Sequence, residues 1–416
     1  MKRKINMAVV GYGHRSPGMV NLLLEMPDVN IVGICDVYED RAAAGGKNVA
    51  EHSKKAPMVT TDYRRLLEIK NLDAVFTPSS WTSHGRIMLD AMEAGCYVAT
   101  EVGGATSVQQ CWDLVRTSER TGKPCMLLEN CCYGRDEMLV LNMVKKGLFG
   151  ECVHAEGGYR HDLRKEVCQG RENRHYRLDN YSHRNGDVYP THDLGPISKY
   201  LNINRGNRML MLTSMASKSV GLNHWMEKNC PPDYDITHRA FALGDVVTTM
   251  IKCAHGETIT LTHDTSLPRP YSRANLLQGT KGIWSEDKHA FFIEGISKES
   301  GSWTEFWQPY EEIVSQFEHP LWKEFQSGGV KGGHGGMDWL VLRAFIEAVK
   351  NGTRTPIDVY DTASWMAITA LSEESVAMGS LPVAIPDFTD GRWINRTDVV
   401  RGKYCLDEIC EEAFKN

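Results

Sequence analysis

The chain contains 416 residues, of which 42% are hydrophobic and 24% are charged, as is usual for a globular protein with a large core. Its 47 basic and 53 acidic residues give a formal net charge of −6, which argues against a nucleic-acid-binding protein because such proteins carry a basic excess. No apolar run approaches the ~18 residues that a membrane span requires, and the length is typical of two or three domains.

In the first third of the chain, short apolar runs rich in β-branched residues alternate with stretches of helical periodicity. We expect strands at 5–10, 29–35, 72–77, 96–100 and 124–129, separated by helices at 19–25, 41–52, 83–94 and 108–121. This alternation predicts a doubly wound parallel sheet. The first predicted domain is therefore a Rossmann domain over residues 1–130.

After residue 130 the pattern changes to strands separated by longer irregular stretches. We expect helices at 136–146, 338–350 and 360–377, and strands at 152–159, 208–214, 246–251, 258–264 and 290–295. Such a succession of strands is typical of an open, mainly antiparallel sheet. The second predicted domain is an α/β domain over 131–384, whose helix 360–377 packs back on the Rossmann domain, and 385–416 form a C-terminal tail.

The loop after the first strand has the properties of a dinucleotide-binding turn. Gly11 permits a tight turn, and Gly13 lets the backbone approach a pyrophosphate at the start of the next helix. The spacing of Gly11, Gly13 and Gly18 departs from the usual motif, so a nucleotide-free domain is the alternative. Asp36 ends the second strand, where a carboxylate binds ribose hydroxyls and disfavours a 2′-phosphate, which favours NAD over NADP.

Other polar or aromatic residues follow the later strands, at the edge where doubly wound sheets bind ligands. For His84 the alternative is a histidine that begins a helix without touching a cofactor. The residues expected to bind NAD are Gly11, Gly13, His14, Arg15, Asp36, Trp81, His84, Glu101, Val102 and Asn130.

Several motifs together resemble the Gfo/Idh/MocA oxidoreductases, and more closely the NAD-dependent α-N-acetylgalactosaminidases of glycoside hydrolase family 109. The matching segments are 81–84, 101–104, 128–133, 157–160, 189–196 and 332–338. Most Gfo/Idh/MocA members have Glu-Lys-Pro where this chain has Glu101-Val102-Gly103. Because the lysine helps to polarise the substrate hydroxyl, its absence argues against ordinary dehydrogenase chemistry.

The resemblance implies a hydrolysis in which NAD transiently oxidises C3 of the sugar. The C2 proton then becomes acidic and is removed by a base, and the glycosidic oxygen leaves C1 by elimination. Water adds to the unsaturated intermediate, and C3 is reduced again, so that NAD is regenerated in each turnover.

Three residues are candidates for the acid–base steps. His192 follows a Pro-Thr pair and is expected to begin a helix, where a neutral imidazole is favoured; we assign it to the C3 side. Tyr159 ends a predicted strand, and a nearby Arg160 or Arg177 would favour its ionisation. Glu129, also at a strand end, would bind a sugar hydroxyl or relay a proton. A purely structural role is the alternative for each.

The expected substrate-binding residues are Tyr159, Arg177, Tyr189, His192 and Tyr271. The resemblance implies the roles of Tyr159 and Arg177, and tyrosine suits such a site because it offers sugars an apolar face and a polar tip. We expect no metal site, because the chain has no H-E-x-x-H motif and its 12 cysteines form no C-x-x-C pair. His334 and Asp338 lie in or beside a glycine-rich segment and stay outside the predicted catalytic set.

Three readings remain open: a glycosidase that uses NAD catalytically, a conventional NAD-dependent sugar or polyol dehydrogenase that releases NADH, and an inactive sugar or NAD sensor. The expected partners are a small glycoside and further copies of the chain, as a dimer or tetramer, with no nucleic acid. The N-terminus does not read as a signal peptide, so the expected location is cytoplasmic, or periplasmic or secreted if a leader was removed.

Overall fold

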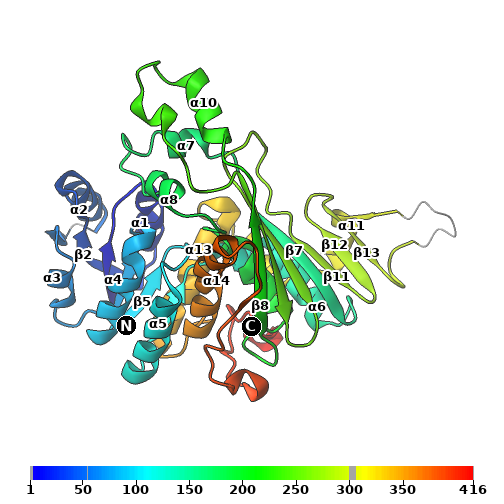
Figure 1. The fold of residues 1–416 in the computed structure, drawn as a ribbon. Coiled ribbons are helices and arrows are strands. Elements are labelled where there is room, and N and C mark those ends of the chain that lie inside the picture. The colour runs from blue at the N-terminus through cyan, green and yellow to red at the C-terminus, as the bar shows by residue number, and fades with distance from the viewer. Residues whose placement is uncertain (1–2, 54, 299–305, 416) are drawn as a thin grey trace. The chain divides into compact units, whose positions relative to one another are not determined.

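The computed structural model describes residues 3–53, 55–298 and 306–415, which form two compact units (Figure 1). The N-terminal unit comprises residues 1–134, 323–364 and 398–416, and the C-terminal unit comprises 135–322 and 365–397. We expected uninterrupted domains over 1–130 and 131–384. The observed division differs because a helix from late in the chain, α13 (Met337–Asn351), packs against the first strand and helix of the N-terminal unit.

The N-terminal unit contains a parallel six-stranded sheet in the order β3-β2-β1-β4-β5-β6. Its strands are β1 (Ile5–Val10), β2 (Val29–Cys35), β3 (Met58–Thr60), β4 (Ala74–Thr77), β5 (Tyr97–Thr100) and β6 (Cys125–Leu127). Its first helices are α1 (Ser16–Leu24), α2 (Glu39–Ser53), α3 (Arg64–Leu67), α4 (Trp81–Glu93) and α5 (Val108–Thr121). This order confirms the predicted doubly wound sheet, and it places the topological switch point between β1 and β4.

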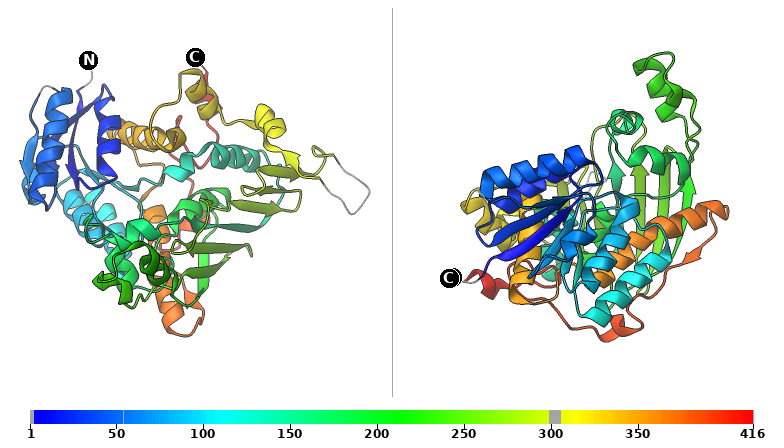
Figure 2. Two further views of the ribbon diagram at one scale, coloured as in Figure 1. Left: turned by 90° about the horizontal axis from the view of Figure 1, so that it is seen from above. Right: turned by 90° about the vertical axis from the view of Figure 1, so that its left-hand side faces the viewer.

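The C-terminal unit contains a nine-stranded mixed sheet in the order β14-β13-β12-β11-β7-β10-β9-β8-β15 (Figure 2). Its strands are β7 (Cys152–Arg160), β8 (Met209–Ala216), β9 (Val246–Cys253), β10 (Thr258–Asp264), β11 (Leu276–Gly279), β12 (Gly282–Ser285), β13 (Ala290–Ile293), β14 (Gln308–Pro309) and β15 (Val383–Ala384). Only the pair β7–β10 is parallel among the pairs of described residues in this sheet. The predicted mainly antiparallel sheet is therefore confirmed.

Helices of the C-terminal unit cover one face of this sheet, where α9 packs against β7 and α6 packs against α9. The helices that lie wholly within this unit are α6 (Arg135–Lys145), α7 (Arg164–Cys168), α8 (Arg177–His183), α9 (Thr191–Tyr200), α10 (Gly221–Asn229) and α11 (Tyr310–Phe317). On the other face, side chains such as Met215 and Met250 are more than half exposed. Two helices, α12 (Pro320–Ser327) and α14 (Val359–Ala377), contain two of the four points at which the chain passes from one unit to the other.

The structure differs from the expected elements mainly between residues 160 and 240, where we expected irregular chain apart from a strand at 208–214 and a helix beginning near His192. This region contains α7, α8, α10 and the short 3-10 helix η2 (Asp235–His238). Helices of five to nine residues span too few turns to produce a recognisable apolar period. None of the helices in the described part of the chain is long and apolar enough to cross a bilayer.

Candidate active site

The glycine loop between β1 and α1 lies at the switch point of the parallel sheet. Gly11 has φ of +109°, and a Cβ atom there would lie 2.9 Å from Pro78 and from Ser79 in the loop after β4. The hydroxyl of Ser16 donates to the carbonyl of Gly11 over 2.9 Å and fixes the turn. At Gly13, by contrast, a Cβ atom would meet only the Arg41 guanidinium, at 3.7 Å. Neighbouring backbone thus restricts the conformation at Gly11, whereas at Gly13 there is space for a ligand to approach the backbone.

Asp36 links the end of β2 to this loop. Its carboxylate accepts hydrogen bonds from the backbone N–H groups of Tyr12 at 2.6 Å and of Tyr38 at 2.9 Å. The side chain is 7% exposed, so its orientation is fixed before any ligand arrives. A fixed carboxylate beside an open glycine turn matches the donor and acceptor pattern of an NAD-binding site.

The loops after β4 and β5 are joined through Trp81. Its indole N–H donates to the carbonyl of Val102 over 3.2 Å, and the ring occupies the space that a Cβ atom of Gly103 would need, 2.3 Å away. His84, one turn later on α4, donates from Nε2 to the carbonyl of Ser79 over 2.8 Å. Burial lowers the pKa of His84 to about 4, so the ring is neutral at physiological pH.

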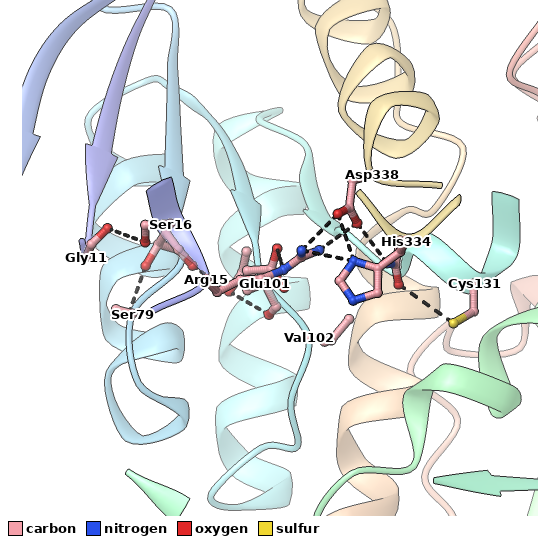
Figure 3. Close-up of polar contacts among 12 residues, drawn as sticks. Gly11, Arg15, Ser16, Ser79, Glu101, Val102, Cys131, His334 and Asp338 are labelled. Carbon is pink, nitrogen blue, oxygen red and sulfur yellow. Dashed lines mark hydrogen bonds and ion pairs between the residues drawn. The ribbon is translucent and has the colours of Figure 1, made fainter. Parts of the chain in front are cut away.

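Arg15 and Asp338 form the centre of a charged network (Figure 3). The Arg15 guanidinium donates to both carboxylate oxygens of Asp338, at 2.8 and 2.6 Å, and its Nε lies 3.5 Å from a Glu101 oxygen. Asn130 and His334 also contact the Asp338 carboxylate, each at 2.9 Å. Burial alone would raise the pKa of Asp338, but His334 and Arg15 hold it well below its usual range.

Glu129 precedes the short 3-10 helix η1 (Asn130–Tyr133) and is fully buried. Its carboxylate accepts a hydrogen bond from the backbone N–H of Cys131 over 3.1 Å and so caps this helix. Since α13 packs against η1, the network of Asp338 and the cap of Glu129 together hold the ends of β5 and β6. His14 is exposed beside this arrangement.

In the C-terminal unit, four of the five predicted substrate-binding residues form one aromatic cluster. The ring of Tyr159, at the end of β7, lies 4.3 Å from that of Tyr189, 5.4 Å from that of His192 and 6.3 Å from that of Tyr271. The hydroxyl of Tyr189 lies 3.5 Å from Nε2 of His192. Tyr159 and Tyr189 are mostly buried, whereas Tyr271 is 49% exposed, so the cluster reaches the surface of this unit on the Tyr271 side.

Arg177, the fifth predicted residue, places a buried positive charge against this cluster. It begins α8, and its guanidinium carbon lies 5.8 Å from the ring centre of Tyr159 and 5.3 Å from that of Tyr189. Nη1 donates to Glu166 on α7 over 2.6 Å. Burial alone would lower the pKa of Arg177, but the tyrosine hydroxyls and Glu166 raise it well above its usual value. Of the two arginines that we expected near Tyr159, Arg177 is therefore the one in contact.

Asp193 anchors the start of α9, which carries His192. It accepts hydrogen bonds from the backbone N–H of Gly158 at 2.5 Å and from the Asn275 amide at 3.2 Å. A Cβ atom at Gly157 would lie 2.1 Å from the Asp193 carboxylate, so only a glycine allows this approach. The two glycines before Tyr159 thus fix the distance between the tyrosine and His192.

Sequence reasoning missed two residues that contact predicted site residues: Asp338, which contacts Arg15 and Asn130, and His161, which contacts Tyr159. Asp338 was set aside, although a carboxylate at the start of a helix beside a glycine-rich segment was visible. His161 was not selected either, and its hydrogen bond to Tyr159 could have been found because residues two apart on a strand share a face.

Comparison with known proteins identifies the family. A family model described as an oxidoreductase family with an NAD-binding Rossmann fold matches residues 5–128, and one described as the glycosyl hydrolase 109 C-terminal domain matches residues 133–395. The chain belongs to glycoside hydrolase family 109. It is a glycoside hydrolase with an NAD-binding Rossmann domain, and its cofactor is NAD.

Two curated relatives cover almost the whole family 109 chain. A glycosyl hydrolase family 109 protein of Stenotrophomonas maltophilia is 40% identical, covering 97% of this chain and 93% of the relative. An alpha-N-acetylgalactosaminidase of Tannerella forsythia is also 40% identical, covering 94% of this chain and 88% of the relative.

Solved structures share the fold at low identity. The myo-inositol 2-dehydrogenase of Lactobacillus plantarum matches with a TM-score of 0.65 at 14% identity, over 92% of this chain and all of that one. A levoglucosan dehydrogenase in complex with NADH and levoglucosan matches with a TM-score of 0.67 at 16% identity, again over 92% of this chain and 100% of that chain. These likenesses establish the Gfo/Idh/MocA fold of the family 109 chain and not its substrate.

Proposed function

We propose that this enzyme hydrolyses terminal α-linked N-acetylgalactosaminides and uses NAD as a catalytic cofactor. The proposal rests on one observation above all: a tyrosine, a histidine and a buried arginine meet in one cluster of the C-terminal unit of an NAD-binding glycoside hydrolase. The substrate follows the printed name of the Tannerella forsythia relative, which is 40% identical.

The N-terminal unit offers the residues that would hold NAD. Asp36 would accept hydrogen bonds from ribose hydroxyls, and the open backbone at Gly13 with the N-terminus of α1 would receive the pyrophosphate. Trp81, His84, Glu101, Val102 and Asn130, with His14 and Arg15 from the glycine loop, complete the proposed set. When bound, NAD supplies a reversible two-electron oxidation of the sugar at C3.

Two side chains would move protons at the sugar. His192 would accept the proton of the C3 hydroxyl, because its imidazole stands at the first turn of α9 with one face against Tyr189. With a carbonyl at C3 the C2 proton is acidic, and the Tyr159 hydroxyl, beside the Arg177 charge, would remove it. Loss of the aglycone from C1, addition of water and return of the two electrons to C3 would then complete the hydrolysis.

The remaining candidates would hold the sugar. Arg177 and Tyr189 would bind hydroxyl groups, and Tyr271, half exposed, would pack its ring against the apolar face of the sugar or its acetamido group. For Glu129, whose buried carboxylate caps η1, we propose contact with a sugar hydroxyl. We also propose that the enzyme assembles as a homo-oligomer.

One assay tests the proposal directly. The purified protein would receive p-nitrophenyl α-N-acetylgalactosaminide without added NAD, and nitrophenol and NADH would be followed together. We expect many turnovers of nitrophenol without net NADH, and a loss of at least about 10²-fold in the Tyr159→Phe and His192→Asn variants. Stoichiometric NADH from free sugars without nitrophenol release would instead indicate a dehydrogenase, which the buried Val102 at the position of the usual lysine argues against.

A further inference from the structure

His161 is the second residue after Tyr159 and directly follows the last residue of β7. Its Nδ1 lies 3.2 Å from the Tyr159 hydroxyl, and the two rings meet edge to face at 5.8 Å. Tyr271 packs against the other side of the imidazole, with ring centres 5.1 Å apart. The imidazole is thus held in place between two tyrosines and has a nitrogen aimed at the reactive phenol.

The surroundings of His161 keep it uncharged at neutral pH. Burial lowers its pKa, and so do the electrostatic interactions with Arg177 on α8 and His192 on α9. The carboxylates of Glu166 on α7 and Asp162 after β7 act in the opposite direction and are outweighed. A neutral imidazole has one nitrogen without a proton, so His161 is able to accept a proton from the phenol.

Neighbouring basic groups are less suited to this task. Arg177 is always protonated, and Nε2 of His192 faces the hydroxyl of Tyr189 at 3.5 Å. The ring centre of His263 on β10 lies 6.5 Å from that of Tyr159, and within the described part of the chain neither of its ring nitrogens makes a hydrogen bond. Nδ1 of His161, in contrast, lies within hydrogen-bond distance of the phenol.

We propose that His161 is the proton acceptor behind Tyr159, a positioning residue that makes the phenol a base at C2 of the substrate. This inference rests on the proposed function and deepens it. As the phenolic oxygen takes the C2 proton, its own proton moves to Nδ1 of His161, and the electrons of the C2–H bond pass into the enolate of the C3 ketone. The phenol stays neutral throughout, while His161 becomes an imidazolium. Return of the proton to the phenol reverses the step during re-protonation of C2.

The test compares His161→Asn with two references. Asparagine places an oxygen or an amide near the position of Nδ1 and keeps a hydrogen bond, but it cannot take up a proton. The matched control is His154→Asn on the same strand, because His154 contacts Thr258 and Glu156 instead of the cluster. Wild type and both variants would be assayed with p-nitrophenyl α-N-acetylgalactosaminide carrying hydrogen or deuterium at C2.

In His161→Asn we expect turnover to fall by about 10²-fold, while the C2 isotope effect on kcat increases and NADH accumulates during turnover. A merely structural role would slow C3 oxidation as well, without a larger isotope effect. His154→Asn should behave as wild type in all these measurements.

A readout without substrate completes the design. Long-range ¹⁵N–¹H spectra, assigned with the His161→Asn variant, should show His161 as the Nε2–H form with an unprotonated Nδ1. A proton on Nδ1 at neutral pH, or equal isotope effects in wild type and His161→Asn, would overturn the inference alone. If wild type releases no nitrophenol from any aryl glycoside, the proposed function fails, and the two failures are thereby distinguished.

Discussion

Replacing Asp338 with asparagine tests whether the Arg15 network stabilises the glycine loop. The substitution keeps the shape of the side chain but removes its charge and one of the two acceptors that the Arg15 guanidinium uses at 2.8 and 2.6 Å. Breaking a buried ion pair costs about 3–5 kcal/mol. Because the Arg15 side chain is 33% exposed, water screens part of this loss, and we expect about 1–3 kcal/mol.

Thermal unfolding and NAD titration would measure the effect. For a unit of this size we expect the Tm to fall by roughly 2–4 °C for each kcal/mol lost. Arg15 precedes α1, so loosening it should also disturb the loop, and we expect NAD to bind about 10-fold more weakly, or ~1.4 kcal/mol. Titration of the protein by calorimetry gives this Kd without any turnover.

The chain offers a matched control on the same helix. Arg343 of α13 pairs with Asp28 at 2.7 and 3.3 Å, away from the glycine loop. Asp28→Asn should lower the Tm but leave the Kd for NAD unchanged. An Asp338→Asn variant with unaltered Tm and Kd would refute the reasoning. So would an Arg15→Met substitution that lowers the free energy of unfolding equally in the wild-type protein and in the Asp338→Asn variant.

Three further predictions concern single substitutions at Gly11, Gly157 and His84. Gly11→Ala should lower stability by about 1–3 kcal/mol and weaken NAD binding in calorimetry, since its Cβ would lie 2.9 Å from Pro78 at a φ of +109°. Gly157→Ala, with Cβ 2.1 Å from Asp193, should reduce kcat about 10-fold or more while the Kd for NAD stays constant; an unchanged kcat would exclude the anchoring role of Asp193. His84 has a folded-state pKa of about 4, so the unfolded chain binds its proton first; the stability it contributes is present above pH 6.5 and is lost as pH falls toward 4, by on the order of 3 kcal/mol. Denaturant titrations at pH 7 and 4.5 should show a smaller loss in His84→Gln than in wild type.

The parallel sheet was predictable because its signals are local. Buried strands of a doubly wound sheet are continuous apolar runs, and α5 (Val108–Thr121) begins after a serine and ends before a glycine in the left-handed conformation. The three-residue edge strand β3 was not found, since Met58 and Val59 are exposed and carry no core pattern. The assignment of α13 to the N-terminal unit depends on packing between distant segments, which no local pattern encodes.

The site was predictable to a lesser extent, and for a different reason. The glycine loop and Asp36 follow from the geometry that a pyrophosphate and a ribose impose, and their places in a strand–loop–helix unit indicated them although the glycine spacing departs from the usual motif. Tyr159, Tyr189 and His192 were selected through the family resemblance, and the structure brings their rings together. The partners that hold them, such as Asp193, are determined by contacts between α9 and β7 that appear only in three dimensions.

Gly157 and Gly158 show how the sequence encodes the contact between α9 and β7. Glycine inside a strand is unfavourable, because it loses entropy on folding and offers no side chain to pack. Here both positions face close neighbours: a Cβ atom at Gly157 would meet Asp193, and one at Gly158 would lie 2.0 Å from the carbonyl of Thr262 on the parallel partner β10. The two glycines therefore make β7 locally less stable, but they allow α9 to approach its backbone. Because His192 directly precedes the anchored Asp193, this approach brings its ring into contact with that of Tyr159. The loss of stability at the two glycines is thus offset by a fixed distance between the two groups that we propose to move protons.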